Sequence, residues 1–307
     1  MSTMEMLFGQ VTMASAFRVA CPMIVAAMGG VFCHATGVFN IAYECLMLCG
    51  AFFAAYGSHI SGSYLVGALF GMGIGALLSL VFGFFVYKLK ANPMLVSSAL
   101  NMSAWALTTL MLYSVFHVRG RVVSKTIINY PKIHMGFLER FPVLDYVIND
   151  NIWMVYFGYI LVIVAYIVMY HTRFGLRCRG VGINPVAAQT AGVDVGRTRW
   201  AALLLMGIFS GLAGSYMPMS GLNTFNENMT SGVGFLVFAA ILVGKSNPIL
   251  TALTCFVFAY TDALSTVLTA LEFPMQLVSM IPYATVVVTL FVVGLRSFTG
   301  KAKVSDT

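Results

Sequence analysis

Nine apolar segments follow one another along almost the whole chain. Most of them approach the ~20 residues that an α-helix needs to cross about 30 Å of hydrocarbon. The chain is 60% hydrophobic and 9% charged, whereas soluble domains carry about 25% charged residues. The pattern therefore excludes a soluble globule and predicts an all-α, polytopic membrane helix bundle with roughly eight to ten transmembrane helices. The segments lie at about residues 11–33, 38–57, 63–87, 93–117, 152–171, 200–219, 231–244, 249–268 and 274–295.

A single transmembrane domain over residues 1–307 uses the full length and leaves no room for a soluble domain. The chain has no phosphate-binding loop of the form G-x-x-x-x-G-K-[ST], no H-E-x-x-H and no G-x-S-x-G. Its six cysteines form no C-x-x-C pair, and its five histidines are scattered. We therefore expect a non-catalytic chain without a metal or other cofactor of its own. We also expect no removable signal peptide.

Lysine and arginine residues between the segments indicate the orientation in the membrane. Counted by alternating sides, eleven fall on one side and five on the other. Because basic residues concentrate in cytoplasmic loops, the loop at about 172–199 and the C-terminus are predicted to be cytoplasmic. The loop at about 118–151 is then external, with room for a short helix, while the side of the N-terminus stays open. The net charge of +7 reflects this topology and predicts no binding of nucleic acid.

The predicted cytoplasmic loop contains a signal for a short helix. Its middle reads NPVAAQTAGV (184–193), with Asn184 in the N-cap position and Pro185 at the first helical position. The loop is too polar to span a bilayer, so we expect this helix to lie on the cytoplasmic surface. A membrane subunit needs such a helix where a soluble motor protein pushes on it. Five arginines surround it, namely Arg173, Arg177, Arg179, Arg197 and Arg199.

The segment GVFNIAYECLMLCG (37–50) places Asn40 and Glu44 at membrane depth. Polar groups in hydrocarbon are costly, and broken helices are tolerated where they line a cavity. We expect a broken or re-entrant helix here, with Glu44 bonded to backbone amides freed by a break near Gly37–Asn40. Glu44 either lines a pathway or braces the broken helix, or it is a structural carboxylate.

Two other apolar segments carry polar residues. Ser97 and Asn101 are four residues apart and share one face of the fourth segment. They either bond a neighbouring helix or line a pathway. Asp262 lies in the eighth segment and is either structural or functional.

The loop GLNTFNENM (221–229) is rich in amides and contains Phe225, and Phe235 follows in the short seventh segment. Amides and aromatic rings together suit a sugar or a nucleobase, through hydrogen bonds and stacking. The alternative is an ordinary polar loop followed by aromatic residues that face lipid.

Small residues recur at the spacing that lets helices approach closely. Gly67, Gly71 and Gly75 form one ladder, and Gly207, Gly211 and Gly214 form another. The ladders either pack helices within one bundle or form the seam between two subunits.

Three segments resemble ABC importer permeases. GVFNIAYECLMLCGAFFA (37–54) is similar to their G-x-x-N-I-x-x-E-G-x-M-L-x-G-A-F segment, although Cys45 stands where the family usually has glycine. Residues 173–197 resemble the cytoplasmic coupling segment, and residues 231–248 resemble the G-x-G-F-x-x-I-A-x-A-L-x-G-x-x-x-P segment. The subgroup of ABC importer permeases that these segments resemble transports nucleosides and simple sugars and, more distantly, ribose and branched-chain amino acids. In the first segment the matching residues are Gly37, Asn40, Ile41, Glu44, Met47, Leu48, Gly50, Ala51 and Phe52.

The resemblance implies a multi-pass subunit of the bacterial cytoplasmic membrane, in contact with membrane lipid. Its partners would be a cytoplasmic ABC ATPase that uses ATP and Mg, a second permease subunit and an extracytoplasmic substrate-binding protein. The residues expected to contact the ATPase are Asn184, Pro185, Ala187, Ala188, Gly192 and Arg197. The residues expected along the substrate pathway are Phe39, Asn40, Glu44, Ser97, Asn101, Phe225 and Phe235.

Two other classes of protein compete with this interpretation. A proton-coupled secondary transporter of a small polar solute would use Glu44 or Asp262 to carry the proton, and it typically has more charges at membrane depth. A membrane scaffold or channel subunit is the other class. The arginine-rich loop with its short helix favours the importer, and a neighbouring gene for an ATPase would distinguish the classes.

Overall fold

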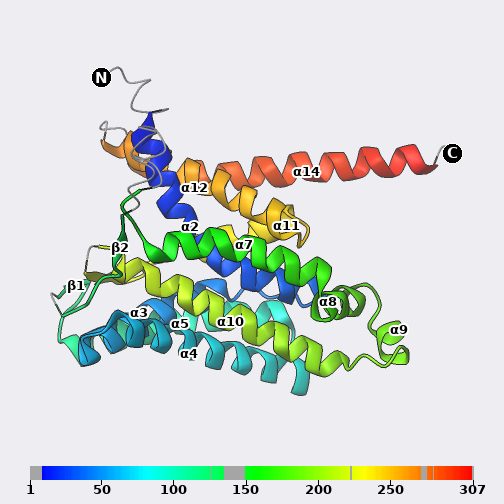
Figure 1. Cartoon of the computed structure of the whole chain (residues 1–307), viewed down its shortest axis with the longest axis horizontal. Coiled ribbons are helices and arrows are strands. Elements are labelled where there is room, and N and C mark those ends of the chain that lie inside the picture. Colours follow the sequence, from blue (N-terminus) through cyan, green and yellow to red (C-terminus); the bar gives the residue numbers. More distant parts are fainter. Residues whose placement is uncertain are drawn as a thin grey trace.

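The computed structural model describes residues 9–124, 126–134, 149–221, 223–270, 275–278 and 280–305. These residues form an elongated helix bundle (Figure 1). The helices are α2 (Gln10–Ala35), α3 (Tyr43–Ser61), α4 (Tyr64–Gly83), the π-helical turn η1 (Phe84–Lys88), α5 (Pro93–Phe116), α7 (Trp153–His171), α8 (Arg173–Ile183), α9 (Pro185–Thr190), α10 (Val195–Met219), α11 (Val233–Val243), α12 (Pro248–Ala270), α13 (Met275–Val278) and α14 (Ile281–Ser305).

Six helices in the described part of the chain are long and apolar enough to cross a membrane, namely α2, the α4–η1 unit, α5, α7, α10 and α12. Two shorter apolar helices, Val233–Val243 and Ile281–Val292, add to them. Together with α3, these helices confirm the expected all-α, multi-pass membrane bundle.

Helices α2 and α10 form the centre of the bundle. Helix α2 packs against α10, α12 and α7, and α10 packs in turn against α3 and α4. The inner part of α2 is rich in small residues such as Ala20, Ala26 and Ala27, all fully buried. Small side chains let helix backbones approach, which matters in lipid because apolar burial alone does not favour helix association there.

The two glycine ladders pack against each other, one on α4 and one on α10. A Cβ atom on Gly75 would collide with the carbonyl oxygen of Gly207, and one on Gly211 would collide with that of Gly71. The ladders therefore pack helices within this bundle, as the first interpretation predicted, rather than forming a seam between two subunits.

Replacing Gly75 with leucine is expected to destabilise the bundle, because the new side chain meets backbone that cannot rotate away. Overpacking costs about 1–3 kcal/mol, and more where helices must separate. Gly73→Leu is the matched control, since a Cβ there has no neighbour within 4 Å. Thermal unfolding in detergent should show a lower midpoint for the Gly75 variant only. Equal midpoints would contradict this packing.

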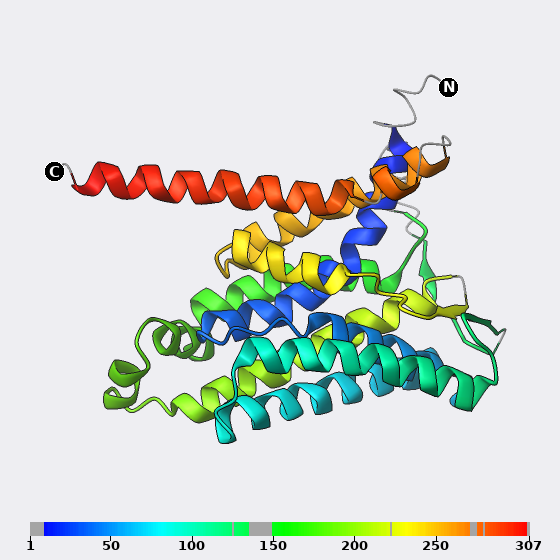
Figure 2. The same ribbon diagram turned by 180° about the vertical axis from the view of Figure 1, so that it is seen from behind.

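Short strand pairs mark one end of the bundle, called the strand end below. β1 (Arg121–Val123) pairs antiparallel with β4 (Thr224–Asn226), and β2 (Lys132–Ile133) pairs with β3 (Asn151–Ile152). Helices α8 and α9 and the C-terminal part of α14 lie at the opposite end, called the α9 end (Figures 1 and 2). The short helix expected within 118–151 falls partly on residues 135–148, which lie outside the described residues.

Helix α2 runs from the strand end to the α9 end. Near its beginning, Arg18 Nε donates to Asn151 Oδ1 at 2.7 Å. At its end, the carbonyl of Ala35 lies against Gly182 of α8. The beginning of α2 therefore lies at the end of the bundle opposite α9. The charge count left the side of the N-terminus open, and the structure places the first described residues opposite the loop that is predicted to be cytoplasmic.

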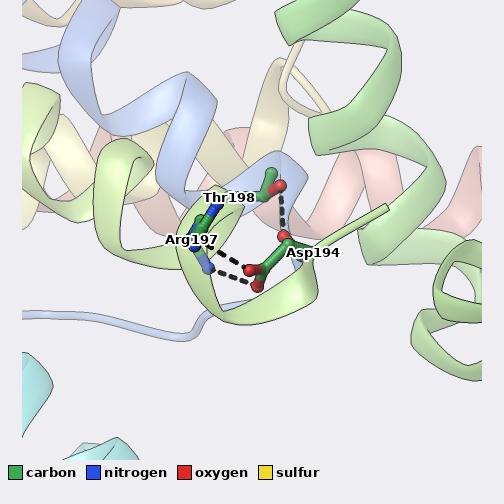
Figure 3. A network of polar contacts seen from close by, with 3 residues as sticks. All are labelled: Asp194, Arg197 and Thr198. Carbon is green, nitrogen blue, oxygen red and sulfur yellow. Dashed lines mark hydrogen bonds and ion pairs between the residues drawn. The ribbon is translucent and has the colours of Figure 1, made fainter. Parts of the chain in front are cut away.

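Helix α10 begins at Val195, five residues before the predicted apolar segment, because Asp194 caps it. Asp194 Oδ1 accepts from Arg197 N at 2.9 Å, and the Thr198 hydroxyl donates to the Asp194 carbonyl at 2.8 Å. Arg197 Nε also pairs with Asp194 Oδ2 at 3.1 Å (Figure 3). Hydropathy alone misses this turn because it is polar.

Candidate functional site

The predicted break in the second apolar segment is present. Residues 36–42 connect α2 to α3 without helical structure, and α3 begins only at Tyr43. Gly37 adopts a φ of +77°, which favours glycine, and lies against Gly182. Asn40 is buried, and its Oδ1 accepts from Ala42 N at 2.8 Å. The break thus lies inside protein, where irregular backbone is tolerated.

Side chains of α5 satisfy the backbone of this break. Asn101 Oδ1 accepts from Cys45 N at 3.0 Å, and Asn101 Nδ2 donates to the Ile41 carbonyl at 3.1 Å. Ser97 Oγ accepts from Ile41 N at 3.1 Å and donates to Asn40 Oδ1 at 3.2 Å. Ser97 and Asn101 were expected either to bond a neighbouring helix or to line a pathway. These contacts support the first interpretation, because both residues bond the neighbouring 40–45 segment.

Glu44 joins the break to a second irregular segment far along the chain. Its Oε1 accepts from the Thr230 hydroxyl at 2.5 Å and from Gly232 N at 2.9 Å. Its Oε2 accepts from Gly234 N at 2.8 Å. We call these contacts the Glu44 clamp. Glu44 does bond backbone amides, as expected, but those of the 230–234 segment. The expectation that they come from Gly37–Asn40 is wrong.

The clamp has a clear electrostatic basis. The amides of Gly232 and Gly234 lie at the beginning of α11, where unpaired N–H groups favour an anion. Gly232 has a φ of +89°, and a Cβ on Gly234 would meet the backbone of Glu44. The sequence reveals both glycines, but nothing in it connects them to Glu44. The clamp is almost completely enclosed, since Glu44 is 7% exposed.

The three aromatic residues that were predicted to lie along the substrate pathway differ in their exposure. Phe39 is exposed and packs edge-on against Phe238 of α11 at 5.0 Å between ring centroids. Phe235 is also exposed on α11. Phe225, by contrast, is 1% exposed and packs on Phe52 at 5.4 Å. Phe225 is thus a core residue beneath the strand end, and this position does not fit its expected place on a pathway.

The expected short helix in the arginine-rich loop is present as α9. Asn184 Oδ1 accepts from Val186 N at 3.0 Å and from Ala187 N at 3.1 Å, and Pro185 occupies the first turn. Gly192 follows the helix with a φ of +83°. The loop also contains α8, which sequence analysis missed.

Helix α8 could have been recognised from two signals. Thr172 caps it by accepting from Gly175 N at 3.4 Å. Cys178 and Val181 bury one face at helical spacing. Burial raises the pKa of the Cys178 thiol to about 12, so this cysteine is a protonated packing residue.

Two highly exposed apolar residues flank the α8–α9 junction. Ile183 is 86% exposed and Val186 is 70% exposed. Sequence analysis selected Ala188 instead, but Ala188 is only 9% exposed and faces its own chain. Its neighbour Ala187 is exposed. The exposed apolar surface at the α8–α9 junction therefore includes Ile183, Val186 and Ala187, whereas Ala188 is buried.

The arginines around α9 are not equivalent. Arg179 stacks over Tyr170 at 4.8 Å, and Arg199 lies 6.0 Å from the ring of Tyr87. Arg197 is largely exposed and pairs with Asp194 as described above. Two of the arginines thus fix α8 and α10 to neighbouring helices. Among the described residues, no group of three or more His, Cys, Asp or Glu side chains could hold a metal ion.

A family model described as "Branched-chain amino acid transport system / permease component" matches residues 12–290. The chain belongs to this family. It is 33% identical to the nucleoside ABC transporter permease protein NupC of Lactococcus lactis, over 95% of this chain and 93% of that protein. It is 31% identical to the guanosine ABC transporter permease protein NupQ of Bacillus subtilis, over 92% and 90%.

A more distant relative is a putative glucose ABC transporter permease of Haloferax volcanii, 26% identical over 80% of this chain and 74% of that protein. No solved structure matches the chain significantly. The chain is thus a non-catalytic, multi-pass membrane subunit of the ABC transporter class.

Proposed function

We propose that this chain is the permease subunit of an ATP-driven ABC importer for nucleosides in a bacterial cytoplasmic membrane. The observation that carries the proposal is the similarity, over more than nine-tenths of the chain, to permeases named for nucleoside and guanosine transport. A simple sugar is the second candidate substrate, because a putative glucose permease also matches most of the chain.

The proposed partners follow from the similarity to ABC transporter permeases. A cytoplasmic ATPase would hydrolyse ATP with Mg and contact the exposed residues around the α8–α9 junction. A second permease subunit would complete the pathway, and an extracytoplasmic binding protein would deliver substrate at the strand end. Residues 1–307 would act as one transmembrane domain.

A contiguous set of contacts leads from α9 to the Glu44 clamp. Helix α8 packs against the end of α2, where Gly182 meets Ala35 and Gly37. Residues 36–42 follow directly, and α3 then brings Glu44 to the 230–234 segment. We propose that displacement of α8 and α9 by the ATPase shifts this break and opens or closes the clamp.

The clamp favours the importer over the proton-coupled transporter. All three groups that Glu44 bonds donate to its oxygens, so both oxygens already serve as acceptors within the chain, as a structural role requires.

Transport assays test the proposal. The chain, its ATPase and its second permease are reconstituted in vesicles with the binding protein and labelled guanosine, uridine, ribose or glucose. We expect uptake of a nucleoside that requires ATP and survives collapse of the proton gradient. Uptake that follows the gradient without ATP would refute the importer function, and uptake of glucose or ribose alone would replace the nucleoside by a sugar.

A further inference from the structure

A cavity of about 810 Å³ lies in the strand-end half of the bundle, separate from the polar contacts of the α2–α3 break. It is lined mainly by residues of α2, α10, α12, α14 and the 229–233 segment, and it is open on one side. Its lining includes the early part of α2 around Met23, the late part of α12 from Asp262 to Thr269, and the beginning of α14 at Tyr283. Its size is that of pockets for small organic ligands, roughly 300–1,000 Å³.

The wall formed by α12 is polar. Asp262, Thr266 and Thr269 recur at helical spacing on the face that lines the cavity. The hydroxyls of Thr266 and Thr269 donate to backbone carbonyls one turn earlier, at 3.2 and 2.9 Å, so their oxygens remain available as acceptors. The Asp262 carboxylate makes no hydrogen bond or ion pair within the described residues.

Most of the other residues that line the cavity are apolar or aromatic. Tyr216, Met217, Met23 and Met229 are among them, and Tyr283 lines the cavity from α14. A carboxylate at membrane depth without a partner is costly, so its retention beside an open cavity points to a partner that enters from outside the chain. Acceptors on one wall and thioethers and aromatic rings on the others match a neutral solute with several hydroxyl donors and a flat ring.

The floor of this cavity is part of the Glu44 clamp. Thr230 and Ser231 line the cavity. Thr230 also donates to Glu44, and the Tyr283 hydroxyl donates to the Ser231 carbonyl at 2.9 Å. An occupant of the cavity would therefore touch the segment that Glu44 holds.

We infer that this cavity is a substrate subsite within the single subunit, where Asp262 accepts hydrogen bonds from the sugar hydroxyls of a nucleoside and the Met and Tyr side chains cover the base. This inference rests on the proposed function and adds the residues that recognise the substrate. Through Thr230 and Ser231, occupancy of the subsite is linked to the clamp.

The test uses the reconstituted complex of permeases, ATPase and binding protein, with guanosine and uridine as probes. Asp262→Asn keeps the size of the side chain but removes the charge and one acceptor, and it should raise the KM of ATP-dependent uptake at least tenfold with little change in the maximal rate. Thr266→Val should raise KM severalfold. Thr261→Val is the matched control, because Thr261 lies on the same helix, bonds the Phe258 carbonyl and does not line the cavity. Its KM should stay within twofold of the wild type.

A second measurement does not depend on transport or on the Asp262 variants folding. Thr269→Cys places a thiol in the cavity wall, and guanosine should slow its modification by a polar thiol reagent. Unchanged KM for Asp262→Asn, or modification of Thr269→Cys that guanosine does not slow, would overturn the subsite. Protection by a detergent or lipid but not by guanosine would overturn it in favour of an acyl-chain cavity. ATP-independent uptake in the wild type would instead refute the importer function itself.

Discussion

Replacing Glu44 with leucine is expected to reduce ATP-dependent uptake by at least tenfold while the subunit still reaches the membrane. Leucine removes both oxygens that hold the 230–234 segment, and it leaves the Thr230 hydroxyl and the amides of Gly232 and Gly234 without their acceptor. A buried donor without a partner costs about 1–3 kcal/mol. The loss of three acceptor contacts is therefore sufficient to release the 230–234 segment from α3.

Glutamine at position 44 should have an intermediate effect. Its carbonyl oxygen can take the place of Oε1 and keep the bonds from Thr230 and Gly232. Its amide nitrogen then faces Gly234 N, where two donors oppose each other. We therefore expect uptake to be lowered severalfold by Glu44→Gln, far less than by Glu44→Leu.

Thr230→Val shows the effect of losing a single hydrogen bond of the Glu44 clamp. It removes the hydroxyl donor and leaves the backbone amides of Gly232 and Gly234 bonded to Glu44. Uptake into vesicles and the yield of assembled complex are measured for all three variants. Uptake is expected to be highest for Thr230→Val, lower for Glu44→Gln and lowest for Glu44→Leu. A glutamine variant as inactive as the leucine variant, together with gradient-driven uptake in the wild type, would show that Glu44 carries a proton.

The sequence predicts the local features of this site better than its long-range contacts. The break near Gly37, the cap at Asn184 and the shared helix face of Ser97 and Asn101 depend on residues a few positions apart, so spacing reveals them. The partners of Glu44 lie 186 to 190 residues further along the chain. No periodicity connects such distant segments, and only the folded bundle brings them together.

Exposure was the other property that the sequence did not reveal. Ala188 and Ile183 both lie in the predicted cytoplasmic loop, and composition alone favours the small residue as a contact surface. The structure turns Ala188 toward its own chain and exposes Ile183. Likewise, Phe225 is in an amide-rich loop that resembles a binding surface, but β4 pairs with β1 and buries its side chain.

Replacing both Ile183 and Val186 with aspartate is expected to abolish ATP-dependent uptake by separating the permease from its ATPase. Both side chains are apolar and among the most exposed at the α9 end, so a partner that covers them gains about 25 cal/mol for each Å² of apolar surface removed from water. A carboxylate in the same contact loses that gain and costs several kcal/mol more if it stays unpaired. Neither side chain supports its own chain, so folding should be unaffected.

The decisive measurement separates docking from folding and from substrate binding. In the Ile183→Asp/Val186→Asp variant, the ATPase should no longer co-purify with the permeases, while the thermal midpoint of the membrane subunit stays at the wild-type value. Val123→Asp is the matched control, because Val123 is also exposed but lies in β1 at the opposite end, so the ATPase should be retained. Ala188→Asp should instead lower the thermal midpoint, since that side chain faces its own chain. Full retention of the ATPase by the double variant would place the docking surface elsewhere and remove α9 from the coupling mechanism.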